Sequence, residues 1–160
     1  GMKILGIDPG TGIVGFGVIE TTRKDYKLLD GGVIRTPARQ ADELRLMTIY
    51  DSLSEIIDLH MPDVMVVEKL FFARNVTTAM TVSQARGVIL LAATKKGIPT
   101  AEYTPLQIKM ALTGYGRADK KQIQEMVRVL LRLNEIPKPD DCADALAAAL
   151  THAHTGIAGN

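Results

Sequence analysis

Two apolar segments of this sequence each end in an acidic residue. Asp8 closes the run KILGID, and Glu68 closes the run DVMVVE. A carboxylate at the end of a buried strand is costly to desolvate unless a cation compensates its charge. A third acidic segment, DCAD, contains Asp141 and Asp144 and opens an alanine-rich stretch. Three separated segments that each supply carboxylates indicate one acidic site rather than scattered surface charge.

The four carboxylates predict a binding site for hard divalent cations. Residues three apart share one helical face, so Asp141 and Asp144 can point at one centre. Asp8 and Glu68 would meet that face if their strands are neighbours in a sheet. Crowded carboxylates repel one another, and oxygen ligands favour Mg²⁺, with Mn²⁺ as a substitute, over Zn²⁺. Two such ions about 4 Å apart are the usual machinery for the attack of water on a phosphodiester, so we expect two metal ions in the site.

The three histidines do not suggest a zinc site. His152 and His154 lie two residues apart, so they leave a helix on different faces, and His60 adds no zinc-ligand spacing. We interpret the three as structural or solvated side chains.

Length and composition suit an ordinary globular domain. The chain has 160 residues, of which 46% are hydrophobic and 23% charged, and its formal net charge is +1. We expect a single domain over residues 1–160, with Gly1 as a cloning remnant and residues 155–160 as a frayed tail. The single cysteine, Cys142, excludes an internal disulfide and fits a reducing compartment. We find no apolar segment long enough to span a bilayer and no secretory signal, so we expect a cytoplasmic protein.

The acidic segments lie in a predicted α/β domain. The first three strands follow one another through short turns, which favours antiparallel pairing. The hydrophobic period then changes, and helices alternate with further strands. Strands are expected at residues 3–8, 12–20, 26–36, 63–68 and 100–103, and helices at 41–60, about 75–96, about 105–112, 119–133 and 141–154. This order indicates a five-stranded mixed sheet, antiparallel at first and parallel afterwards, flanked by helices.

Four ordered sequence blocks resemble the RuvC family of Holliday-junction resolvases. The blocks are ILGIDPG from residue 4, VEKLFF from residue 67, GYGRADK from residue 114 and DCADALA from residue 141. The resemblance implies a ribonuclease-H-like fold, a homodimer and a branch-migration complex as a partner. It also implies paired symmetric nicks across a four-way DNA junction, leaving 5′-phosphate and 3′-hydroxyl ends, in homologous recombination and DNA repair. Asp8, Glu68, Asp141 and Asp144 match the family's catalytic carboxylates, although some relatives carry histidine at the position of Asp141.

Positive charge gathers after residue 108, although the net charge of the whole chain is close to zero. The charged residues there include Lys109, Arg117, Lys120, Lys121, Arg128, Arg132 and Lys138, against Asp119, Glu125 and Glu135. A protein that cleaves DNA needs such cations to offset the repulsion between phosphates and its own acids. By resemblance, Lys109 and Lys120 match basic residues needed for activity. Lys121 beside Lys120 leaves the choice between those two open, and we place Arg117 in the same DNA-binding set.

An aromatic pair follows the second strand-end acid. Phe71 and Phe72 come directly after the Glu68 segment in a chain with only 4% aromatic residues. One of the two can belong to the core, while the other can stack on an unpaired base at the junction centre. By resemblance Phe71 is the better candidate for stacking. Arg74 and Asn75 are expected to continue this loop toward the DNA backbone.

Small residues form a strip on the helix expected at residues 75–96. Ala79, Ser83 and Gly87 recur four apart, which gives one face a narrow surface suited to close helix packing. The strip can pack on the helix's own sheet or across a two-fold axis. The family resemblance favours the two-fold axis, since paired cuts in a nearly symmetric junction suit a dimer with two sites.

Two other classes of function share parts of this pattern. The segment DPGTG after the first strand looks like the first phosphate loop of actin-type and sugar-kinase phosphotransferases. That fold needs a duplicated domain and a second glycine-rich loop, which this chain lacks. A nuclease-fold protein that binds nucleic acid without cutting it would not need all four acids. A ribonuclease H would keep the same metal site and differ only in substrate. We therefore predict a Mg²⁺-dependent endonuclease that resolves Holliday junctions.

Overall fold

The protein folds around one five-stranded mixed sheet with helices on both faces. The computed structural model describes residues 1–10, 12–69 and 76–155. The strand order is β3-β2-β1-β4-β5, in which β1, β2 and β3 pair antiparallel while β4 and β5 run parallel to β1. The strands are β1 (Lys3–Asp8), β2 (Ile13–Thr21), β3 (Tyr26–Arg35), β4 (Val64–Glu68) and β5 (Thr100–Tyr103). This arrangement confirms the predicted mixed sheet.

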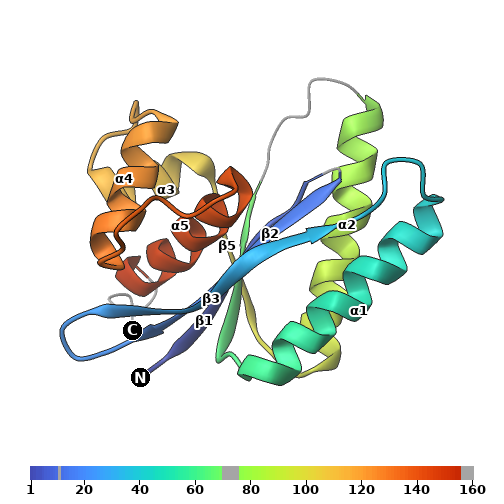
Figure 1. Cartoon of the computed structure of the whole chain (residues 1–160), viewed down its shortest axis with the longest axis horizontal. Helices are drawn as coiled ribbons and strands as arrows, with labels where there is room; N and C mark the ends of the chain where they lie inside the picture. Colours follow the sequence, from blue (N-terminus) through green and yellow to red (C-terminus); the bar gives the residue numbers. More distant parts are fainter. Residues whose placement is uncertain (11, 70–75, 156–160) are drawn as a thin grey trace.

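The five helices are divided between the two faces of the sheet. They are α1 (Asp42–His60), α2 (Val76–Lys95), α3 (Pro105–Thr113), α4 (Lys120–Leu130) and α5 (Asp140–Thr155). Figure 1 shows α1 and α2 on one face and α3, α4 and α5 on the other. The sheet is therefore covered on both sides, and the strands that carry the predicted acids lie in its interior.

The core consists of two apolar clusters, one on each face of the sheet. Consecutive residues of β1 serve both clusters, because successive strand side chains point to opposite faces. Ile4 packs with Val66 and with Leu146 of α5, whereas Leu5 packs with Leu53 on the face of α1 and α2. This two-sided burial explains why the sequence of β1 is apolar almost throughout.

Helix α5 packs closely on β1 and β2, where glycines face it. A Cβ atom built on Gly6 would lie 2.0 Å from the carbonyl oxygen of Ala145. A Cβ atom on Gly15 would lie 2.0 Å from the carbonyl oxygen of Asp141. Any larger residue at these two positions would push the helix away from the sheet. The glycines thus bring the acidic start of α5 against the strand that ends in Asp8.

Most predicted elements agree with the structure, and one helix is shorter than expected. The helix predicted to reach residue 133 ends at Leu130, and Arg132 then adopts a left-handed backbone with φ of 56°. A left-handed residue cannot continue an α-helix, so the chain turns there toward the start of α5. The expected cap at Asn75 lies outside the described residues.

Among the described residues, α2 is one helix that is long and apolar enough to cross a membrane by length and composition. No such segment was expected from the sequence, but an 18-residue window of α2 reaches a mean hydropathy of 1.2. Core helices of soluble proteins pass the same test, so the match is weak support for a membrane span. In the fold, α2 packs on α1 and buries Ala85, Ile89, Ala92 and Ala93.

Candidate active site

The two strand-end acids lie side by side at one edge of the sheet. β1 and β4 are parallel neighbours with Ile7 opposite Val67. Asp8 and Glu68 are the next residues along these two strands, so they lie next to each other. Asp8 is only 9% exposed, and Glu68 is half-buried. The carboxyl ends of parallel strands are a common place for ligand sites in α/β sheets. The predicted meeting of these two segments therefore occurs in the structure.

Burial and mutual repulsion make these carboxyls weak acids. Burial, the largest cause, raises the pKa of Asp8 from 3.8 to about 8, and the Glu68 carboxylate is the second cause. Asp144 and Asp141 act on Asp8 in the same direction. Burial followed by the charge of Asp144 raises the pKa of Glu68 to about 7, while a hydrogen bond with Asp8 opposes that shift. Ionising all of these carboxyls at once is therefore unfavourable unless a bound cation compensates their charge.

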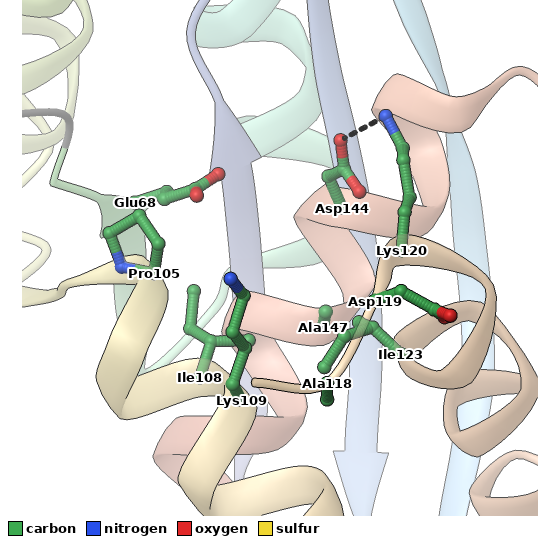
Figure 2. A pocket seen from close by; sticks show the side chains of 10 residues that line it. All are labelled: Glu68, Pro105, Ile108, Lys109, Ala118, Asp119, Lys120, Ile123, Asp144 and Ala147. Atoms are coloured by element: carbon green, nitrogen blue, oxygen red, sulfur yellow. Dashed lines mark ion pairs between the residues drawn. The ribbon is translucent and has the colours of Figure 1, made fainter. Parts of the chain in front are cut away.

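The helix acids face the strand acids from the opposite side. Asp144 lines a cavity of about 260 Å³ together with Glu68, and burial raises its pKa. Figure 2 shows Glu68 and Asp144 on facing walls of this cavity, with Lys109 between them at its base. Asp141 lies in the first turn of α5, and its charge contributes to the raised pKa of Asp8. The four predicted acids therefore lie close enough together for their charges to interact.

Lys120 points at the acidic cluster. Its Nζ lies 3.5 Å from an oxygen of Asp144 and 3.5 Å from an oxygen of Asp140. Burial alone would lower the pKa of Lys120, but the charges of Asp144 and Asp140 outweigh it and raise the pKa. Lys121 is exposed and does not line the cavity, and Arg117 is exposed on the loop before α4.

Asp140 also belongs to this cluster, although its position after Pro139 in the sequence suits a helix N-cap better than a site residue. It is the first residue of α5, and its carboxylate accepts a hydrogen bond from Nε2 of Gln124 at 3.1 Å. Its place next to Lys120 requires α4 and α5 to meet, which no local pattern shows. Its separation of four residues from Asp144 was the available signal, since that spacing shares one helical face.

The donor chemistry of the site fits a hard divalent cation. The converging groups are carboxylate oxygens, and their raised pKa values show that negative charge there needs compensation. Within the described ranges, no group of three or more acidic, histidine or cysteine side chains is close enough to hold a metal ion as placed. The carboxylates would therefore have to draw together around a bound ion.

The loop predicted to contact DNA lies outside the described residues. Phe71 or Phe72 was expected to stack on a base, and Arg74 and Asn75 to approach the DNA backbone, and these roles stay predictions.

Two of the histidines are hydrogen-bonded to tyrosines. Nδ1 of His152 is hydrogen-bonded to the hydroxyl of Tyr103 at 2.8 Å. The equivalent atom of His154 is hydrogen-bonded to the hydroxyl of Tyr26, also at 2.8 Å.

A mixed sheet with acids at the ends of β1 and β4 and on the facing helix defines the ribonuclease-H-like class of folds. Comparisons with known proteins narrow that class. The family model described as crossover junction endodeoxyribonuclease RuvC matches residues 4–152. The chain therefore belongs to the RuvC family. This confirms the resemblance seen in the sequence and decides against the phosphotransferase alternative.

Similar proteins of this family match almost the whole chain. Crossover junction endodeoxyribonuclease RuvC of Brevibacillus brevis is 57% identical over 152 residues, covering 95% of this chain and 92% of that protein. The RuvC of Heliobacterium modesticaldum is 57% identical over 154 residues, covering 96% of this chain and 95% of that protein. A Thermus thermophilus RuvC structure in complex with a Holliday junction substrate has a TM-score of 0.95 at 38% identity, covering 99% of this chain and 97% of that chain.

Proposed function

We propose that this protein is a metal-dependent endodeoxyribonuclease that resolves four-way DNA junctions by paired symmetric nicks. The products would be 5′-phosphate and 3′-hydroxyl ends, in homologous recombination and DNA repair. Membership of the RuvC family supports the reaction and its substrate. The observation that carries the proposal is the buried Asp8 beside Glu68, while Glu68 and Asp144 line one cavity together. Buried carboxylates at facing positions are costly unless the site binds cations.

Four residues would hold the metal. Asp8, Glu68, Asp141 and Asp144 supply oxygen ligands suited to Mg²⁺, with Mn²⁺ as a substitute and two ions per site. When bound, such ions activate water and stabilise the charge that develops on the phosphate. Asp8 would be the central carboxylate of this set, because the charges of the other three acids all raise its pKa.

Two lysines would supply positive charge to the phosphate. Lys109 and Lys120 line the same cavity as Glu68 and Asp144, so a phosphate that enters it meets both ammonium groups. Lys120 is bound to Asp140 as well as to Asp144, which keeps it near the cavity if Asp144 turns to a metal. Arg117 and Lys121 are exposed near this opening and would contact the flanking DNA backbone, which positions a duplex without reading its sequence.

The active protein would be a homodimer built on α2. On this helix Ser83 and Gly87 are exposed and Ala79 is partly buried, and a Cβ atom built on Gly87 would meet nothing within 4 Å. Met80 and Leu91 are 59% and 52% exposed on the same helix. An exposed apolar helix with small residues suits close packing across a two-fold axis. A branch-migration complex remains a proposed partner on family grounds alone.

A cleavage assay on three substrates tests this proposal. Labelled four-way junction with a mobile core, linear duplex and RNA–DNA hybrid are each incubated with the protein and Mg²⁺. We expect paired, ligatable nicks in the junction only. Cleavage of the hybrid alone would assign the site to ribonuclease H chemistry, and no cleavage with Mg²⁺ or Mn²⁺ would contradict a catalytic role. Asp51→Asn, an exposed acid on α1, is the matched control for variants of the site acids.

A further inference from the structure

Arg86 connects helix α2 to the strand that carries Glu68. Its Nη1 donates a hydrogen bond of 3.0 Å to the backbone carbonyl oxygen of Glu68. Its Nη2 forms an ion pair with the carboxylate of Glu102 on β5. The Arg86 side chain is 22% exposed, so both contacts are partly shielded from water. One guanidinium therefore joins α2, the last residue of β4 and the edge strand β5.

These contacts fall where the sheet ladder ends. Glu68 is the last residue of β4 and lies opposite Tyr103, the last residue of β5. The N–H of Lys69 donates to the carbonyl oxygen of Tyr103 at 2.8 Å, which fixes the peptide after Glu68 from one direction. Arg86 binds the carbonyl of that same peptide from α2. The backbone that orients the Glu68 side chain is thus held from two sides at the point where regular pairing stops.

We propose that Arg86 is a positioning residue for Glu68, fixing the end of β4 so that the Glu68 carboxylate faces Asp8 and Asp144. The inference rests on the proposed function, in which Glu68 is a metal ligand. Groups that hold a metal ligand in place are as much a part of a metal site as the ligands, and their loss commonly weakens metal binding about 10–100-fold. A planar guanidinium suits this role because it binds two acceptors in a fixed geometry.

A purely stabilising role explains the placement of Arg86 less well. Partly exposed ion pairs contribute little to stability because solvent screens them and the side chains lose freedom. The neighbouring residues through which α2 packs on the core are small or aliphatic, such as Ala85, Ile89 and Ala92. Arg86 differs from these residues in that its side chain is polar and reaches the backbone carbonyl of Glu68.

Mn²⁺ binding to the DNA-free protein, measured by titration calorimetry, tests the proposal without relying on cleavage. Arg86→Met keeps the length of the side chain and removes both hydrogen bonds, so we expect Mn²⁺ affinity to fall at least about 10-fold. Lys95→Met is the matched control, because it removes a cation from the last turn of α2, where Lys95 lies over the Tyr50 ring. Its Mn²⁺ affinity should stay within about twofold of the wild type, since Lys95 is exposed at the opposite end of α2 from the acidic site.

Two further variants separate the possible failures. If Glu68→Gln leaves Mn²⁺ affinity unchanged, Glu68 is not a ligand and the proposed function fails. If Glu68→Gln weakens binding but Arg86→Met does not, only the role of Arg86 is overturned. The double variant should bind like Glu68→Gln alone, because Arg86 acts through Glu68, and additive losses would refute that route. Should Arg86→Met not fold, Arg86→Lys replaces it with a smaller expected loss, and wild-type affinity in that variant would overturn the proposal.

Discussion

The two ends of α5 carry polar clusters of opposite character. At the start of the helix, Asp141 and Asp144 join the strand acids, and burial with mutual repulsion raises the pKa of Asp8 to about 8. At the other end, His152 and His154 are each hydrogen-bonded to a tyrosine hydroxyl at 2.8 Å. One end of the helix holds like charges together, and the other holds polar groups that satisfy one another.

Within this one helix, the acidic end serves function and the histidine end serves stability. A buried polar group that finds a partner costs little, whereas like charges held together lower the stability of the folded state. Sites that bind ions or substrates commonly carry such a cost, which stabilising variants remove along with activity. The acidic end should therefore lose activity and gain stability when altered, whereas the histidine end should lose stability and keep its activity.

Removal of the buried acid should have the largest effect on activity. We expect Asp8→Asn to lower junction cleavage by at least about 1000-fold, because a neutral amide is a poor metal ligand and the metal is proposed to stabilise most of the developing charge. Junction binding, measured by gel shift in Ca²⁺, should remain. Loss of binding together with cleavage would show that Asp8 serves the fold rather than the reaction.

The same variant should stabilise the metal-free protein at high pH. Below pH 3.8 the Asp8 carboxyl is protonated in both the folded and the unfolded chain. As the pH rises toward 8, this carboxyl loses its proton in the unfolded chain but keeps it in the folded chain. Folding therefore becomes less favourable as the pH rises. Relative to the wild type, Asp8→Asn should gain about 2–4 kcal/mol of unfolding free energy at pH 8 in EDTA and almost nothing near pH 4. Urea unfolding at the two pH values measures this. An equal gain at both would point to packing instead of charge.

The part of the site that follows from strand ends could be predicted from the sequence. Apolar runs that close on Asp8 and Glu68 fix both the strands and the edge where the acids emerge, and helical spacing places Asp144 beside Asp141. The contacts of Arg86 with Glu68 and of Lys120 with Asp140 could not be predicted, because they depend on how α2 and α4 pack. Local patterns do not encode such packing, and the pairing of Tyr26 with His154 likewise joins residues 128 positions apart.

The adjacent residues Lys120 and Lys121 differ in their relation to the acidic end of α5. Lys120 contacts Asp140 and Asp144, whereas Lys121 is exposed outside the cavity. We expect Lys120→Ala to lower the cleavage rate about 100–1000-fold at saturating junction, as the loss of one group that stabilises transition-state charge commonly does. Lys121→Ala should stay within about threefold at low salt and mainly weaken binding. The reverse order in single-turnover cleavage would assign the role to Lys121.

The smallest expected effect lies at the histidine end. Tyr103→Phe keeps the ring and removes the hydroxyl that is bonded to His152, so it should cost about 0.5–1.5 kcal/mol, or about 1–6 °C in melting temperature. Because His152 is only partly buried, water can replace part of the lost bond, which favours the lower half of that range. Cleavage by the folded variant should match the wild type. Tyr115→Phe, on an exposed loop tyrosine, is the control and should change neither quantity. A loss of cleavage in Tyr103→Phe without a loss of stability would mean that the two ends of α5 are not separate, since β5 would then transmit the change at Tyr103 to Glu68.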